Sequence, residues 1–91
     1  MKTIAVVGMS PNPERPSHFV SKYMINHGFK IIPVNPGQKE ILGLRCYPAL
    51  KDIKYEVDIV NVFRNSDYAS PIIQEAISIK AKAIWLQDGI V

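Results

Sequence analysis

Residues 2–15, KTIAVVGMSPNPER, decide the predicted fold, because they describe a buried strand that runs into a loop at the start of a helix. The apolar run Ile4–Val7 is typical of a central parallel strand, both faces of which are covered. Gly8 ends the run, and a residue without a Cβ atom lets a ligand approach the backbone. Ser10 and Arg15 stand before a helix N-terminus, which attracts phosphate. The stretch predicts a nucleotide-phosphate site, although the same pattern also opens βα units that bind nothing.

Length and composition indicate one domain, residues 1–91, with 47% hydrophobic and 21% charged residues, as in soluble globular chains. The apolar runs are too short to span a membrane. The single Cys46 forms no internal disulfide and no signal-like segment opens the chain, so we expect a cytoplasmic protein. The net charge of +3 comes from scattered lysines, which argues against a nucleic-acid partner and suits a small anionic ligand.

Strands alternate with helices along the sequence. Strands are predicted at residues 4–7, 30–34, 57–63 and 82–86, and helices at 17–27 and 69–77, with a short edge strand within 42–47 and one helical turn within 48–53. Such an order predicts right-handed βαβ crossovers and an α/β fold, a doubly wound parallel sheet in three α/β/α layers.

Local signals predict the ends of these elements. Ser17 is the expected N-cap of the first helix, and Gly28 its left-handed C-terminal residue. Phe19, Val20, Tyr23, Met24 and His27 define its expected apolar face, and His18 and His27 are expected at the surface or its boundary. For the second helix, Asp67 and Ser70 are both candidate caps, and Pro71 favours Ser70. Pro33 indicates that the second strand is not central in the sheet.

Ligands of doubly wound sheets bind beyond the carboxyl ends of the strands, where four polar or glycine-containing loops meet here: residues 8–17, 35–39, 64–67 and 87–89. The loops carry the cations Arg15, Lys39 and Arg64. The glycine fingerprint of NAD sites is incomplete at 8–13, and Asn35 stands where those sites carry an acid. A neutral residue there, with cations nearby, suits a 3′-phosphorylated ADP.

Short segments occur in a fixed order along the whole chain: AVVGMS at 5–10, ERPS at 14–17, VNP at 34–36, ILG at 41–43, CYP at 46–48, VFR at 62–64 and WLQ at 85–87. Together they resemble the small bacterial and archaeal CoA-binding domain proteins and, more distantly, the CoA-binding domain of the succinyl-CoA synthetase alpha subunit. The resemblance implies a Rossmann-like fold. Two departures stand out: Lys80 replaces a family glycine, so the second helix is expected to end differently, and the chain is C-terminally short relative to the family.

The resemblance also implies that the cofactor is coenzyme A. By resemblance, the phosphates contact Gly8, Ser10, Arg15 and Ser17, and the adenosine is flanked by Val34, Asn35 and Pro36. Phe63 and Arg64 form another wall of the site, with Gln87 close by. Met9 and Lys39, from the same loops, complete the predicted site.

The leading hypothesis is a CoA-binding module without catalysis. The alternatives are a module for another adenine nucleotide such as NAD(P) or ADP, an acyl-CoA enzyme that uses Cys46 or His18, and a ligand-free interaction domain. Arg64 and Arg15 are expected to bind the anion, whereas Arg45 is not. The last strand, which contains Trp85, is expected at a sheet edge, where it favours a homo-oligomer.

Overall fold

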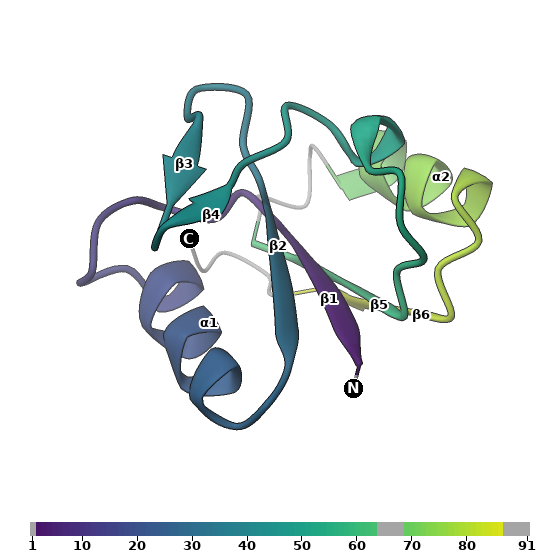
Figure 1. Cartoon of the computed structure of the whole chain (residues 1–91). Coiled ribbons are helices and arrows are strands. Elements are labelled where there is room, and N and C mark those ends of the chain that lie inside the picture. Colours follow the sequence, from purple (N-terminus) through teal and green to yellow (C-terminus); the bar gives the residue numbers. More distant parts are fainter. Residues whose placement is uncertain (1, 64–68, 87–91) are drawn as a thin grey trace.

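The computed structural model describes residues 2–63 and 69–86, within which four strands form a parallel sheet (Figure 1). The strands are β1 (Thr3–Val7), β2 (Lys30–Val34), β5 (Ile59–Val62) and β6 (Ala83–Leu86), in the order β2-β1-β5-β6. The chain moves outward from β1 to β2 and later returns to the other side of β1 with β5. The winding therefore reverses between β1 and β5, and the prediction of a doubly wound, Rossmann-like α/β sheet is confirmed.

Helices cover both faces of this sheet, as Figure 1 shows. Ile4 of β1 packs in a cluster with side chains of α1 (Pro16–Asn26). The next residue, Ala5, packs in a second cluster with side chains of α2 (Ala69–Ser78) and of the short 3-10 helix η1 (Leu50–Asp52). Successive side chains of a strand point to opposite faces of the sheet. A strand that is covered on both faces must therefore be apolar along its whole length. The three predicted layers are confirmed.

A hairpin covers the outer side of β2. It consists of β3 (Glu40–Ile41) and β4 (Leu44–Arg45), antiparallel and joined by a two-residue turn. Both turn residues are left-handed, Leu42 with φ 55° and Gly43 with φ 72°, the backbone that such tight hairpins need. The short edge strand predicted within 42–47 is present as β4, and its partner β3 was not predicted.

Tyr47, which follows this hairpin, pairs with the outer side of β2 through its backbone. Its amide donates to the Pro33 carbonyl (2.9 Å), and its carbonyl accepts from the Asn35 amide (2.9 Å). β2 is an edge strand of the four-stranded sheet, as Pro33 indicated, but its free side is largely occupied.

Helix α1 begins one residue earlier than predicted and buries a different face. It starts at Pro16, and Ser17, the expected N-cap, lies in the first turn and is fully buried. Its buried residues also include His18 and Ser21, whereas Phe19 and Tyr23 are exposed. The predicted apolar face is therefore right at Met24, which packs in the cluster with Ile4, and wrong at Phe19 and Tyr23. Small polar side chains are buried instead, because hydrogen bonds satisfy them in place.

The end of α1 follows the prediction. Gly28 is left-handed with φ 89°, and the Phe29 amide donates to the Met24 carbonyl (3.1 Å). This is the Schellman pattern, in which a residue without a Cβ atom avoids the strain of a positive φ. An added Cβ at Gly28 would meet no atom within 4 Å, so strain alone favours glycine there.

The end of α2 repeats that pattern with a lysine. Lys80 has φ 63°, and the Ala81 amide donates to the Ala76 carbonyl (3.1 Å). The expectation that this helix ends differently is wrong, because the burial of Ala76 and the packing of Ala81 fix the turn despite the strain. At its start, α2 begins at Ala69, so Ser70 is not its cap; Asp67 lies outside the described residues.

Asp58 joins three strands at the amino end of the sheet. Its carboxylate accepts from the Thr3 amide (2.8 Å), and its carbonyl accepts from the amides of Lys82 and Ala83. The Lys82 ammonium lies 3.2 Å from the same carboxylate. The hydrogen bond from Thr3 is the main cause that lowers the pKa of Asp58, and Lys82 is the second.

Among the described residues, no helix is both long and apolar enough to cross a bilayer.

Candidate functional site

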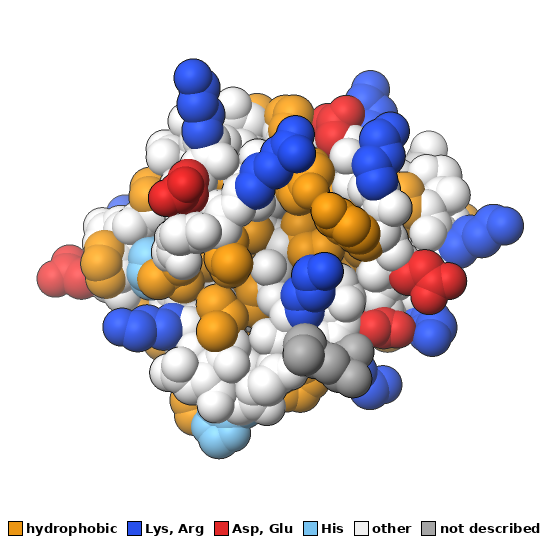
Figure 2. Space-filling model, viewed as in Figure 1, with side chains coloured by type: hydrophobic (Ala, Val, Ile, Leu, Met, Phe, Trp, Pro, Cys, Tyr) orange, Lys and Arg blue, Asp and Glu red, His pale blue; other side chains and the backbone are white. Residues whose placement is uncertain are grey.

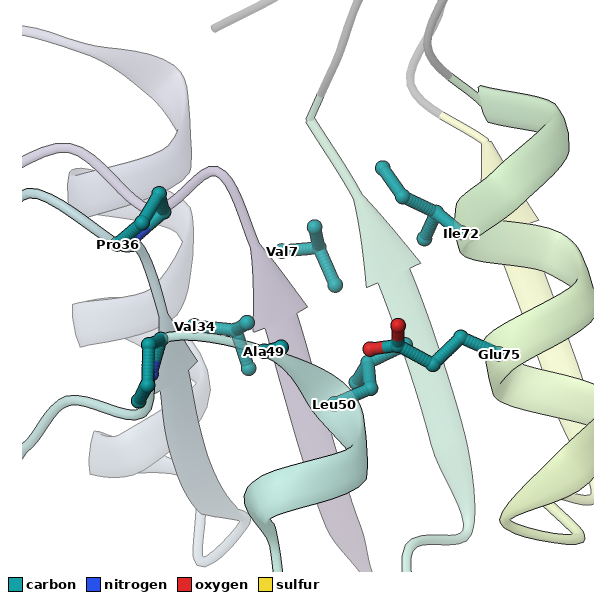
Figure 3. Close-up of a pocket in the computed structure, with 8 residues that line it drawn as sticks. Val7, Val34, Pro36, Ala49, Leu50, Ile72 and Glu75 are labelled. Carbon is teal, nitrogen blue, oxygen red and sulfur yellow. The ribbon is translucent and has the colours of Figure 1, made fainter.

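A hollow of about 360 Å³ opens at the carboxyl end of the sheet, on the face that α2 covers (Figure 3). It lies where β1 and β2 end, between the segment that leads into η1 and one side of α2. Its size suits a small-molecule fragment, and its walls are mostly apolar, as in ligand sites generally. The lining consists of Val7, Val34, Pro36, Pro48, Ala49, Leu50, Ile72 and Glu75.

The structure brings two of the predicted adenosine-flanking residues to this hollow, Val34 and Pro36. Sequence reasoning missed the opposite wall, which comes from residues 48–50 and from α2. One signal was present, since the segment CYP at 46–48 belongs to the family resemblance and leads into that wall. The contribution of α2 depends on how the helix is placed on the sheet, which no local pattern reveals.

Glu75 is the acidic residue of the lining. Its carboxylate points from α2 into the hollow, beside Leu50 (Figure 3). One carboxylate oxygen, Oε1, accepts a hydrogen bond from the Lys51 amide at 3.2 Å. The hydrogen bond ties α2 to η1 and orients the carboxylate in the hollow.

The loop after β1 is held in shape by its own hydrogen bonds. Gly8 is left-handed with φ 81°, and its amide donates to the Val34 carbonyl (2.8 Å). Further along, the Ser10 amide donates to the Ser17 hydroxyl (2.9 Å), and the Asn12 amide to the Ser10 hydroxyl (3.0 Å). These amides are the groups that a phosphate-binding loop usually offers, and here they are engaged within the chain.

Two side-chain groups of this loop remain suited to an anion. Arg15 is exposed directly before α1, and the half-buried Ser10 has a hydroxyl hydrogen to donate. Met9 is fully buried in the cluster beneath α1, so its side chain is part of the core. Ser17 is also fully buried, and its hydroxyl accepts from the Ser10 amide, which makes it a support of the loop.

Asn35 links the loops that follow β1 and β2. Its amide nitrogen donates to the Met9 carbonyl (2.9 Å), and its amide oxygen accepts from the Gly37 amide (2.9 Å). A carboxylate has no hydrogen to donate to Met9, so an acid does not fit this position. The residue that distinguishes this loop from an NAD site is therefore a structural tie between two loops.

The other predicted site residues lie apart from the hollow or outside the described part of the chain. Phe63 is 2% exposed and packs in the cluster on the α1 face. Lys39 is exposed before β3. Arg64 and Gln87 fall in the undescribed residues. On the viewed face, Lys and Arg side chains are spread out rather than gathered in a stripe (Figure 2).

Cys46 and His18 both make backbone contacts. The Cys46 thiol is buried and donates to the Asn35 carbonyl at 3.5 Å. Burial raises the pKa of Cys46, which disfavours the reactive thiolate, and the Asn35 contact only partly opposes this. His18 is 7% exposed, which corrects the expectation of a surface residue, and its Nδ1 donates to the Ser10 carbonyl (2.9 Å). Both side chains support the loops.

Comparisons with known proteins identify the family and the fold of the chain. The family described as "CoA binding domain" matches residues 2–91. The uncharacterized protein YneT of Bacillus subtilis is 47% identical over 90 residues, 99% of this chain and 67% of YneT. A hypothetical protein from Pyrococcus horikoshii OT3 superposes with a TM-score of 0.90 at 40% identity, over 92% of this chain and 59% of that one.

A larger enzyme also contains a similar segment. Acetate–CoA ligase (ADP-forming) II of Archaeoglobus fulgidus is 42% identical over 60 residues, which are 64% of this chain and 9% of the ligase. Similarity to the ligase is thus confined to a small part of that enzyme.

Proposed function

Because this chain belongs to the family of CoA-binding domains, we propose that it binds coenzyme A as a module without catalysis of its own. The observation that carries the proposal is the hollow at the carboxyl end of the sheet, lined by Val34 and Pro36. The family resemblance implies an adenosine flanked by those two residues and Asn35, and doubly wound sheets bind nucleotides at this end.

The proposal assigns different parts of CoA to different surfaces. The apolar hollow suits the adenosine, since the described residues of its walls include no cation for a phosphate. The Arg15 side chain and the Ser10 hydroxyl, on the loop after β1, suit the phosphates. Asn35 and Ser17 act as positioning residues, because their hydrogen bonds hold that loop.

Calorimetric titration of the purified protein with CoA, dephospho-CoA, ADP and NAD tests this function. We expect CoA to bind about tenfold to hundredfold more tightly than dephospho-CoA, because its 3′-phosphate gains charge-assisted contacts. Equal affinities for these two would show that the 3′-phosphate is not recognised. Tighter binding of NAD would reject the CoA assignment and favour the alternative, a site for another adenine nucleotide.

Arginine substitutions test where the phosphates lie. Arg15→Ala and Arg64→Ala are expected to weaken CoA binding by about 1–3 kcal/mol each, the loss of one charge-assisted hydrogen bond. Arg45→Ala is the matched control, because the Arg45 guanidinium lies over the Tyr47 ring, 5.0 Å from its centroid. Equal effects of Arg15→Ala and Arg45→Ala would indicate a general charge effect instead of a site.

We also propose that the protein associates with a second copy through β6. Among the described residues this strand is at the edge of the sheet, and Trp85 and Leu86 are 42% and 54% exposed. Exposed apolar edge strands tend to pair with other chains. Sedimentation equilibrium is expected to show a dimer that Trp85→Ser weakens and that Tyr23→Ser, a change of an exposed aromatic residue on α1, leaves intact. A monomer at high concentration would contradict this.

A further inference from the structure

Building on the proposed CoA site, we infer that Glu75 recognises the adenine base. Its carboxylate accepts a hydrogen bond from the exocyclic amine of an adenine held in the hollow. Glu75 is thus a specificity-determining residue for the base, a role that the sequence did not suggest. The inference rests on the composition of the lining and on the contacts of the carboxylate.

The described residues of the lining combine apolar walls with one kind of charge. Seven of the lining residues are aliphatic or proline, and Glu75 supplies the carboxylate. Such a hollow repels phosphates and other anions, and it favours a neutral group that has apolar faces and an N–H donor. Within CoA, adenine and the pantetheine amides meet these conditions.

Adenine fits the hollow better than the pantetheine arm. It is rigid and flat, so placing it between fixed walls costs little conformational entropy, whereas the flexible arm must be ordered. The walls stand opposite each other, with Val7 and Val34 at the ends of strands and Ile72 on α2 (Figure 3). A planar ring between them covers apolar surface on both of its faces.

Glu75 is oriented before any ligand arrives. The Lys51 amide holds Oε1 at 3.2 Å, and the carboxylate points into the hollow (Figure 3). The second oxygen of the carboxylate is thereby directed at a ligand without the loss of side-chain freedom on binding. Hydrogen bonds to charged acceptors are the stronger kind, so the amine is expected to contribute measurably to selectivity.

A pair of ligands isolates this hydrogen bond. In 1,N6-etheno-coenzyme A a two-carbon bridge joins the adenine amine to N1, so the base has no exocyclic N–H, while the ribose, the phosphates and the pantetheine arm are unchanged. Calorimetry is expected to show that the wild-type protein binds CoA about tenfold to hundredfold more tightly than the etheno analogue. Adenosine 3′,5′-bisphosphate and its inosine counterpart, which lack the pantetheine arm, are expected to show a preference of the same direction.

Two variants connect that preference to Glu75. Glu75→Gln keeps an oxygen for the Lys51 amide and is expected to reduce the preference, and Glu75→Leu removes every acceptor and is expected to abolish it. Glu56→Gln is the matched control: it removes the same charge from a position before β5, at the amino end of the sheet, and is expected to keep the preference. Circular dichroism of each variant verifies folding.

The outcomes separate this inference from the proposed function. Tight CoA binding by the wild type with equal affinity for the etheno analogue would overturn the role of Glu75 and leave the CoA proposal intact. Loss of affinity for both ligands in Glu75→Leu with an unchanged ratio would place another part of CoA beside Glu75, which also overturns it. Absence of CoA binding by the wild type would overturn the proposed function itself.

Discussion

Asn35 and Asp58 hold opposite ends of the same sheet, and each does so with a side chain that bonds to backbone groups. At the carboxyl end, the Asn35 amide donates to the Met9 carbonyl and accepts from the Gly37 amide. At the amino end, the Asp58 carboxylate accepts from the Thr3 amide and faces the Lys82 ammonium. The Asn35 side chain must both donate and accept a hydrogen bond, whereas the Asp58 side chain only accepts.

This difference shows how the two ends are specialised. The carboxyl end has loops that must be tied together without filling the hollow, and a neutral amide does this without adding charge beside it. The amino end has no such constraint, and there a carboxylate gains from both an amide and a lysine. The two positions look interchangeable in a sequence, yet the structure makes opposite demands on them.

The largest expected effect comes from Asn35→Asp. The variant loses the donor to the Met9 carbonyl and places a carboxylate beside it, so we expect about 1–3 kcal/mol less unfolding free energy at neutral pH. Proximity to the carbonyl should raise the pKa of the new acid, so the deficit should shrink as the pH falls toward about 4 and the acid gains a proton. Urea denaturation across this range measures it.

Asn12→Asp is the control for that experiment. The Asn12 side-chain oxygen accepts from the Glu14 amide (3.0 Å), which a carboxylate does equally well. It should therefore change the unfolding free energy little. If both variants lost the same stability, the tie through Met9 would not be the cause.

Gly28→Ala tests how much backbone strain the amino end tolerates, since α1 ends there. We expect it to lower the unfolding free energy by about 1 kcal/mol, the cost of a left-handed residue with a side chain. A methyl group at Gly28 meets no neighbour, so steric overlap adds nothing to this cost. A thermal melt with no shift would show that the turn adjusts instead.

Lys80→Gly makes the opposite change at the end of α2. Lys80 already adopts φ 63°, so a glycine should relieve strain and raise stability, by less than about 1 kcal/mol because glycine also gives the unfolded chain more freedom. Lys82→Gly, directly before β6, should instead destabilise, because it removes the ammonium that lies beside the Asp58 carboxylate. If Lys80→Gly also destabilised, contacts of the lysine stem would outweigh the strain.

Asp58→Asn should have the smallest effect. The new amide oxygen still accepts from the Thr3 amide, and only the pairing with Lys82 is lost. Because the pKa of Asp58 is lowered in the folded protein, its contribution is present above about pH 4, the usual value, and is lost as the pH falls through the lowered pKa.

Stability curves of the wild type and Asp58→Asn should therefore differ at neutral pH and converge in acid. Asp52→Asn on η1 makes the same change of charge away from this contact and serves as the control. A constant difference at every pH would show that the titration of Asp58 is not responsible.

Much of the fold could be predicted from the sequence, because its elements have local sequence patterns or because both faces of the sheet are covered and its strands are therefore apolar throughout. The apolar run Ile4–Val7, the edge position of β2 with Pro33, and the left-handed Gly28 all appear in the structure as expected. The features that depend on long-range packing could not be predicted in this way. Much of the buried face of α1 is polar, with His18 bonded to a loop carbonyl, and a periodicity of apolar residues cannot reveal it.

Strained residues were also hard to foresee. Leu42 and Lys80 occupy left-handed positions that local preference assigns to glycine or asparagine, so neither the hairpin nor the second helix end had its usual signal. At the candidate site, the wall from β2 could be predicted through Val34 and Pro36. Glu75 was missed because the fold alone brings α2 to that hollow.

The hydrogen bonds of Asn35 make its resistance to deamidation important for the protein. Asparagine deamidates when the backbone nitrogen of the next residue attacks the side-chain amide and closes a succinimide ring. The next residue here is Pro36, whose ring nitrogen has no hydrogen to lose, so that route is closed at this position. Pro36 thus has two roles, as a wall of the hollow and as protection against the spontaneous conversion of Asn35 to the aspartate that this loop does not tolerate.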